Sequence, residues 1–210
     1  MFVRTYTSRH LDANCYVIYN EYLAFIVDPC VSFEIIKKDL KCKIAGIFIT
    51  HGHYDHFYAL DSFLKNTNDD VLIYLHKNAI EKLKNSRLNY SYIEYNDLEF
   101  NCDNRFKTIE EGELVINDIK FNIIETFGHT NCSISILFDD ILFTGDFLFK
   151  GSIGRTDLYT GDITTMNLSL MKIKELDLLK KYDDFYVYPG HGEMTTLNQE
   201  FKYNYYLKNW

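Results

Sequence analysis

Short apolar runs separated by polar turns dominate the chain, and their lengths are typical of β-strands. Leu23–Val27 ends at Asp28-Pro29, because proline cannot donate to a strand ladder. The other segments predicted to form strands are Phe2–Thr7, Cys15–Tyr19, Ile44–Ile49, Leu114–Ile116, Ile119–Ile124, Ser133–Phe138, Ile141–Thr144 and Phe185–Tyr188. Asp139-Asp140 predicts a two-residue hairpin turn between the seventh and eighth of these nine strands.

Helical spacing occurs between some of these runs. Phe57, Leu60 and Leu64 fall on one face of a helix predicted over Asp55–Asn66. The other predicted helices are Phe33–Leu40, Thr164–Lys180 and Leu197–Leu207, whereas residues 69–103 show no clear period. No repeat, low-complexity stretch or linker interrupts the 210 residues, so we expect a single mixed α/β domain over residues 1–210.

Net charge, apolar run lengths and cysteine spacing indicate which kinds of partner and which cellular compartment to expect. The chain has 22 Lys and Arg against 30 Asp and Glu, a formal net charge of −8, which argues against a nucleic-acid-binding protein. The residues 1–16 hold no apolar core of a secretory signal, and no apolar run is long enough to span a membrane. Five cysteines form no C-x-x-C pair, which favours reduced thiols. We therefore expect a cytoplasmic protein; a homo-oligomer is left open.

Metal-ligand side chains follow the ends of four predicted strands. Residues 49–57 read ITHGHYDHF, and similar strand ends precede Gly128-His129, Gly145-Asp146 and Gly190-His191. Loops at one edge of a sheet commonly carry chemistry, so these side chains form one candidate cluster. Its members are His51, His53, Asp55, His56, His129, Asp146 and His191. The two remaining histidines, His10 and His76, stand alone and are expected to have ordinary structural roles.

The chemistry of this cluster indicates metal. Five imidazoles and two carboxylates exceed the three or four ligands of one zinc ion and fit two ions of borderline hardness that share a carboxylate. No cysteine occupies these positions, so a closed thiolate site is not expected. The sequence therefore predicts a catalytic centre with two divalent metal ions. Imidazole suits zinc, iron, copper or nickel, and we expect zinc first, with iron or a zinc–iron mixture as alternatives.

The motif His51-Gly52-His53-Tyr54-Asp55-His56, with the three later strand ends, resembles the metallo-β-lactamase superfamily. The resemblance runs from Ala13-Asn14-Cys15-Tyr16 to the last predicted helix. It implies a four-layer αββα sandwich, in which two mixed β-sheets are flanked by helices. It also implies that one metal is held by His51, His53 and His129, that the other is held by Asp55, His56 and His191, and that Asp146 bridges them. A metal-bridging hydroxide would attack an ester-like bond, with Asp55 orienting it or accepting its proton.

Within the superfamily, residues 143–162 and 189–197 resemble the short bacterial glyoxalase II-like thioesterases. The expected substrate is a small thioester such as S-lactoylglutathione or a related thiol ester. Arg155 stands where glyoxalase II holds the carboxylate of the thiol, although a structural ion pair with Asp157 or Asp162 is an equal alternative. Glu193 replaces the family's tyrosine, and Asn131-Cys132 replaces its Pro-Gly, so the identity of the thiol stays open.

Three other functions are kept as alternatives. Persulfide dioxygenases share the fold and a G-R-T-D stretch like Gly154–Asp157, but they use a single iron. A lactonase or another ester hydrolase would use the same ligands. A non-catalytic relative would bind metal without turnover.

Overall fold

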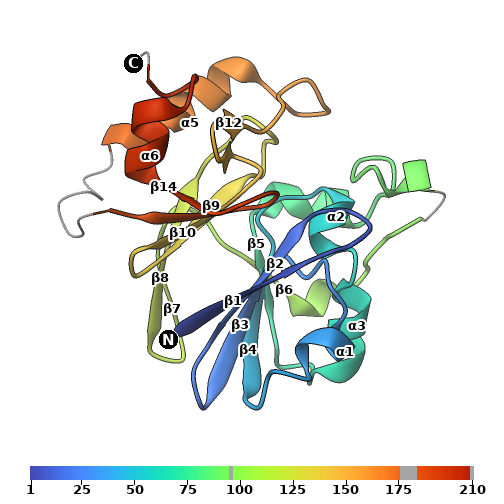
Figure 1. Ribbon diagram of the computed structural model, residues 1–210. Coiled ribbons are helices and arrows are strands. Elements are labelled where there is room, and N and C mark those ends of the chain that lie inside the picture. The colour runs from blue at the N-terminus through green and yellow to red at the C-terminus, as the bar shows by residue number, and fades with distance from the viewer. Residues whose placement is uncertain (95–96, 176–183, 209–210) are drawn as a thin grey trace. The chain divides into compact units, whose positions relative to one another are not determined.

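The computed structural model describes residues 1–94, 97–175 and 184–208 (Figure 1). The chain divides into two compact units, Met1–Ile109 and Glu110–Trp210. Each unit is built around its own six-stranded sheet. The expectation of a single domain over residues 1–210 stays a prediction.

The sheet of the first unit is mixed, in the order β1-β2-β3-β4-β5-β6. Its first three strands pair antiparallel, and β3 to β6 pair parallel. Parallel strands are normally buried on both faces, and β3 and β5 are accordingly almost wholly buried. The strands are β1 Phe2–Thr7, β2 Asn14–Tyr19, β3 Leu23–Val27, β4 Lys43–Phe48, β5 Ile73–Leu75 and β6 Phe106–Thr108.

Short helices follow the strands of the first unit. They are α1 Phe33–Ile36, α2 Tyr54–Phe57, α3 Leu60–Asn66, α4 Ile80–Leu83 and the 3₁₀ helices η1 Lys77–Ala79, η2 Ser91–Glu94 and η3 Asp103–Arg105. The prediction of one helix over Asp55–Asn66 is wrong, because the backbone N–H of Ala59 bonds to the carbonyl of Pro29 at 2.9 Å and the helix breaks there. The first predicted helix is shorter than expected, since Asp39 and Leu40 continue it only as i→i−3 turns.

The sheet of the second unit is also mixed, in the order β14-β13-β10-β9-β8-β7. Only β10 and β13 pair parallel. Phe138 pairs with Ile141, which confirms the predicted turn at Asp139-Asp140. The strands are β7 Gly112–Ile116, β8 Ile119–Glu125, β9 Ile134–Phe138, β10 Ile141–Gly145, β11 Leu148–Phe149, β12 Ser152–Ile153, β13 Tyr186–Pro189 and β14 Thr195–Thr196, with β11 and β12 forming a separate small hairpin.

Two helices, α5 Ile163–Glu175 and α6 Leu197–Tyr203, cover the core of the second unit. Met166, Leu170 and Ile173 recur at helical spacing on α5 and are at most 1% exposed. Burying such a side chain contributes roughly 1.5–3 kcal/mol, so this face fixes the helix on its sheet. The prediction of α5 beyond residue 175 lies outside the described residues.

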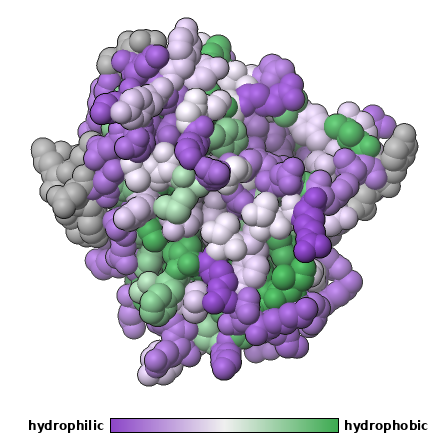
Figure 2. Space-filling model, in the orientation of Figure 1, coloured by the Kyte–Doolittle hydropathy of each residue, from purple (hydrophilic) through white to green (hydrophobic). Residues whose placement is uncertain are grey.

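The predicted mixed α/β fold with two mixed β-sheets and flanking helices is confirmed. Among the described residues, no helix is long and apolar enough to cross a membrane. The face shown in Figure 2 mixes hydrophobic and hydrophilic side chains.

Candidate metal centre

The first group of predicted ligands follows β4. His51 and His53 lie in the loop after the strand, and Asp55 and His56 lie on α2. The three imidazoles are buried, whereas the carboxylate of Asp55 is partly exposed. The structure therefore gathers all four predicted ligands of this unit at the carboxyl end of one strand.

Asp28 organises these histidines. It directly follows β3, the parallel neighbour of β4, and its side chain is 2% exposed. One carboxylate oxygen accepts the backbone N–H of Thr50 at 2.8 Å. The other accepts the Thr50 hydroxyl at 2.7 Å and Nδ1–H of His56 at 2.8 Å. Sequence reasoning read Asp28 only as a strand stop, although it follows an apolar strand as the predicted ligands do.

This network sets the tautomers of two imidazoles. Because the Thr50 hydroxyl donates to Asp28, it accepts Nδ1–H of His51 at 3.1 Å. Nδ1 of His56 likewise donates to the carboxylate. The hydrogen-bond network thus places the lone pair of both rings on Nε2, the arrangement of carboxylate-oriented metal ligands.

The donor atoms also have spacings that fit metal. Nε2 of His51 lies 3.2 Å from Nδ1 of His53. Two nitrogens bound to one tetrahedral zinc at about 2.0–2.1 Å lie roughly 3.3–3.4 Å apart. Nε2 of His56 lies 3.6 Å from a carboxylate oxygen of Asp55. Each pair of donor atoms is therefore suited to occupy two coordination positions on one metal ion of borderline hardness.

The segment 82–91 packs against the loop that carries His51 and His53, here called the ligand loop. Sequence reasoning missed this contact. A Cβ on Gly52 would lie 2.6 Å from the buried stem of Lys82, so only glycine fits between the two histidines. The carbonyl of Asn89 accepts the N–H of Tyr54 at 3.0 Å. The ring of Tyr90 meets that of His53 edge-on, with centroids 5.3 Å apart.

Tyr90 holds an unusual backbone conformation, with φ at 69°. Bulky residues rarely adopt left-handed angles, and such strain persists where the surroundings enforce it. Here the side-chain amide of Asn89 donates to the carbonyls of Lys82 and Leu98 and accepts the N–H of Ser91.

The second unit carries the other three predicted ligands at its own strand ends. His129 lies beyond β8, Asp146 follows β10, and His191 follows β13, the parallel neighbour of β10. One carboxylate oxygen of Asp146 lies 3.5 Å from Nε2 of His129 and 3.7 Å from Nε2 of His191. Nδ1–H of His129 donates to the carbonyl of Arg155 at 2.7 Å, so the lone pair of this ring also sits on Nε2.

The carbonyl of Asp146 is tightly enclosed. A Cβ on Gly154 would lie 1.8 Å from it and 3.1 Å from Nδ1 of His129. Glycine at 154 is therefore required for the loop that carries Arg155 to pass beneath both ligands.

The guanidinium of Arg155 forms the ion pair that the sequence left as an alternative. It donates to both carboxylate oxygens of Asp157, at 2.7 and 2.8 Å. Hydrogen bonding by Arg155 lowers the pKa of Asp157 to about 2. Binding of a substrate carboxylate by this side chain stays a prediction.

Four other residues of interest in the sequence, His10, His76, Cys132 and Glu193, have structural contacts. His10 pairs with Glu94 at 3.4 Å, and Nδ1 of the buried His76 accepts the N–H of Asn78 at the start of η1. Cys132 is fully buried beside the hydroxyl of Thr130, as expected of a packing thiol. Glu193 pairs with Lys150 at 2.7 Å.

Comparison with known proteins identifies the relatives of this chain. A sequence model described as the metallo-beta-lactamase superfamily matches residues 9–191. The chain is 32% identical to probable metallo-hydrolase YqgX of Bacillus subtilis, over 94% of this chain and 93% of that protein. It is 31% identical to hydroxyacylglutathione hydrolase GloC of Haemophilus influenzae, over 93% of each chain. The crystal structure of BLEG-1 B3 metallo-beta-lactamase matches with a TM-score of 0.86 and 31% identity, over 98% of this chain and 99% of that one.

Proposed function

Because this chain belongs to the metallo-β-lactamase superfamily, we propose that it is a metal-dependent hydrolase of small thioesters. The observation that carries the proposal is that hydrogen bonds within each unit already fix the tautomers of three ligand histidines. Nε2 of His51, His56 and His129 each presents a lone pair, because Nδ1 of each ring donates to Thr50, Asp28 or the carbonyl of Arg155. Folding has thus already oriented these ligands, as a metal site requires.

We assign the ligands to two divalent ions, with zinc as the leading candidate and iron or a mixture as alternatives. His51, His53 and His129 would hold one ion, Asp55, His56 and His191 would hold the other, and Asp146 would be shared by both. The short distances within each unit support this assignment. So does the likeness to proteins whose names include metallo-hydrolase and metallo-beta-lactamase.

When bound, such ions supply a nucleophilic hydroxide at neutral pH and a Lewis acid. The protein's own part is orientation and proton handling. Asp55 is the partly exposed carboxylate of the first ligand group and is suited to orient the attacking water or accept its proton. Asp28 keeps His56 in one tautomer, and the Arg155 carbonyl does the same for His129.

The thioester class rests on the relative named hydroxyacylglutathione hydrolase. We propose S-lactoylglutathione or a related thiol ester as substrate, and a cytoplasmic location where such thiols are abundant. The match to a protein named B3 metallo-beta-lactamase makes a β-lactam an essential comparison substrate.

A kinetic panel on freshly purified, metal-analysed protein tests the proposal. It comprises thioesters that differ only in the thiol, together with lactones, a β-lactam and a persulfide with oxygen uptake recorded. We expect close to two metal ions per chain and the highest kcat/KM on a thioester. Turnover of lactones or the β-lactam with inert thioesters would assign another hydrolase. One iron per chain with oxygen uptake would assign the dioxygenase, and bound metal with no turnover would assign a non-catalytic protein.

A further inference from the structure

A pocket of about 620 Å³ lies in the first unit, lined by residues of the β1–β2 connection and of the segments that carry α1 and α2. Eleven residues line it, and none of them is acidic. This is notable in a chain with 30 acidic and 22 basic residues. A volume of this size suits a small organic ligand.

The walls of the pocket are largely apolar. Val31, Ile35, Tyr58 and Ala59 contribute carbon surface. The thiol of Cys30 is buried and donates to the carbonyl of Ala13 at 3.2 Å. Burial raises the pKa of this thiol to about 12, so the wall stays neutral at physiological pH. The body of a ligand here is therefore aliphatic or aromatic.

Arg9 supplies the available charge. It is exposed and lines the pocket, and it forms no hydrogen bond or ion pair with any residue that the structure describes. His10, the other basic residue of the lining, is paired with Glu94 and lies against the ring of Tyr58. An arginine beside an apolar pocket is suited to bind a carboxylate through two parallel hydrogen bonds.

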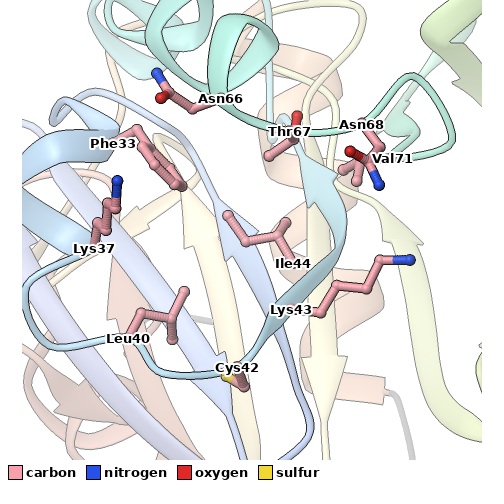
Figure 3. A pocket seen from close by; sticks show the side chains of 10 residues that line it. All are labelled: Phe33, Lys37, Leu40, Cys42, Lys43, Ile44, Asn66, Thr67, Asn68 and Val71. Carbon is pink, nitrogen blue, oxygen red and sulfur yellow. The ribbon is translucent and has the colours of Figure 1, made fainter.

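A second pocket, of about 200 Å³, provides a contrast (Figure 3). Its two lysines are already engaged: Lys43 pairs with Asp70 at 3.3 Å, and Nζ of Lys37 lies 5.7 Å from the ring centroid of Phe33. It also adjoins the start of β4, whereas the ligand loop follows the end of that strand.

The larger pocket adjoins the ligand-bearing segments of its own unit. Tyr58 directly follows α2 and stands three residues after Asp55, which places the two on neighbouring positions of a helical turn. Cys30 stands two residues after Asp28, the acceptor for His56. The pocket is therefore lined by residues of the same two segments that carry Asp55 and Asp28.

We propose that this pocket binds a carboxylate-bearing aliphatic or aromatic group of the substrate, with Arg9 as the cation that holds the carboxylate. This inference rests on the proposed hydrolase function, because it names a class of substrate for the same site. The guanidinium of Arg155 is already paired with Asp157, whereas that of Arg9 is paired with no residue that the structure describes.

Equilibrium binding tests the proposal with 4-phenylbutyrate and its uncharged amide, 4-phenylbutyramide, on full-length protein with and without metal. The metal-free arm removes direct binding of carboxylate to metal. We expect wild-type protein to bind the acid at least about tenfold more tightly than the amide in both arms. Arg9→Met should abolish this preference, and Tyr58→Ala should weaken both ligands. Lys38→Met, which removes an exposed cation outside the pocket, should change neither.

A wild-type protein without the preference, or an Arg9→Met variant that keeps it, would overturn the assignment of Arg9. The thioester panel separates this failure from failure of the proposed function. Thioester turnover without an Arg9-dependent preference rejects the pocket alone. An Arg9-dependent preference without thioester turnover rejects the thioesterase and keeps the pocket.

Discussion

The Asp28 carboxylate accepts Nδ1–H of His56 at 2.8 Å and thereby joins the end of β3 to the helix that follows β4. The carboxylate accepts three hydrogen bonds: two come from Thr50, directly before the ligand motif, and one comes from His56 within it. The register of two neighbouring parallel strands therefore determines how the imidazole of His56 is presented.

Asp28→Asn should lower metal affinity about 10–100-fold, the usual effect of removing a partner that orients a ligand. An amide offers one acceptor and an NH₂ group, so at least one of the three donors loses its partner. Competition against a chromophoric chelator measures the affinity. Asp70→Asn, which alters only an exposed ion pair with Lys43, is the matched control. Equal affinities for both variants would remove Asp28 from the site.

Much of the fold was predictable because β-strands leave a local signal. The bounds of Phe2–Thr7 and Leu23–Val27 agree with the prediction to the residue, since a polar or turn-forming residue, Ser8 or Asp28, follows each run. The break between α2 and α3 was not predictable, because it depends on a hydrogen bond from Ala59 to Pro29, a residue thirty positions away. Local periodicity carries no information about such a contact.

The candidate site divides in the same way. The histidines after β4 and the Asp146 carboxylate could be found because strand ends of a sheet share one edge. Asp28 obeys the same rule and could have been found by it. Tyr90 could not, because its contact with His53 depends on the path of a segment that has no periodic pattern.

Asp146→Ala should lose one metal ion and at least about 100-fold in hydrolysis, because the carboxylate near both His129 and His191 is removed. Metal analysis after gel filtration and the kinetic panel measure the two effects. Asp140→Ala, in the hairpin turn of the same unit, is the control and should retain both. Full activity with two ions in the Asp146 variant would exclude the assignment of this residue as the bridge.

Gly154→Ala should destabilise the protein by about 3 kcal/mol and lower activity, because the new methyl group would overlap the carbonyl of Asp146. The backbone must shift beneath two ligands to relieve that overlap. Urea unfolding measures the stability. The control is Gly151→Asn, since Gly151 has open space around it and its φ of 74° is tolerated by asparagine. Similar stability of the two variants would show that the loop is more adaptable than its geometry indicates.

The strain at Tyr90 predicts an inverted order of stability. Glycine normally destabilises a protein relative to alanine, but at a φ of 69° Tyr90→Gly should be about 1 kcal/mol more stable than Tyr90→Ala. Both variants lose the ring against His53, so both should bind metal more weakly than wild type. Unfolding of the metal-free variants and chelator competition give the two readouts. The usual order of stability, with unchanged metal affinity, would count against any role for Tyr90 in positioning His53.

Arg155 contacts the ligand His129 through its backbone carbonyl, so its side chain can be removed without removing that contact. Its carbonyl accepts Nδ1–H of His129, whereas its guanidinium pairs with Asp157. Arg155→Ala keeps the first contact and removes the second.

If the side chain only pairs with Asp157, Arg155→Ala and Asp157→Ala should each change KM less than about fivefold, the range of an exposed ion pair. If the guanidinium binds a substrate carboxylate, Arg155→Ala should raise KM with little change in kcat, and Asp157→Ala should lower KM because it frees the guanidinium. Since the ion pair is already formed with good geometry, we expect the first result, and opposite shifts of KM in the two variants would assign Arg155 to substrate binding.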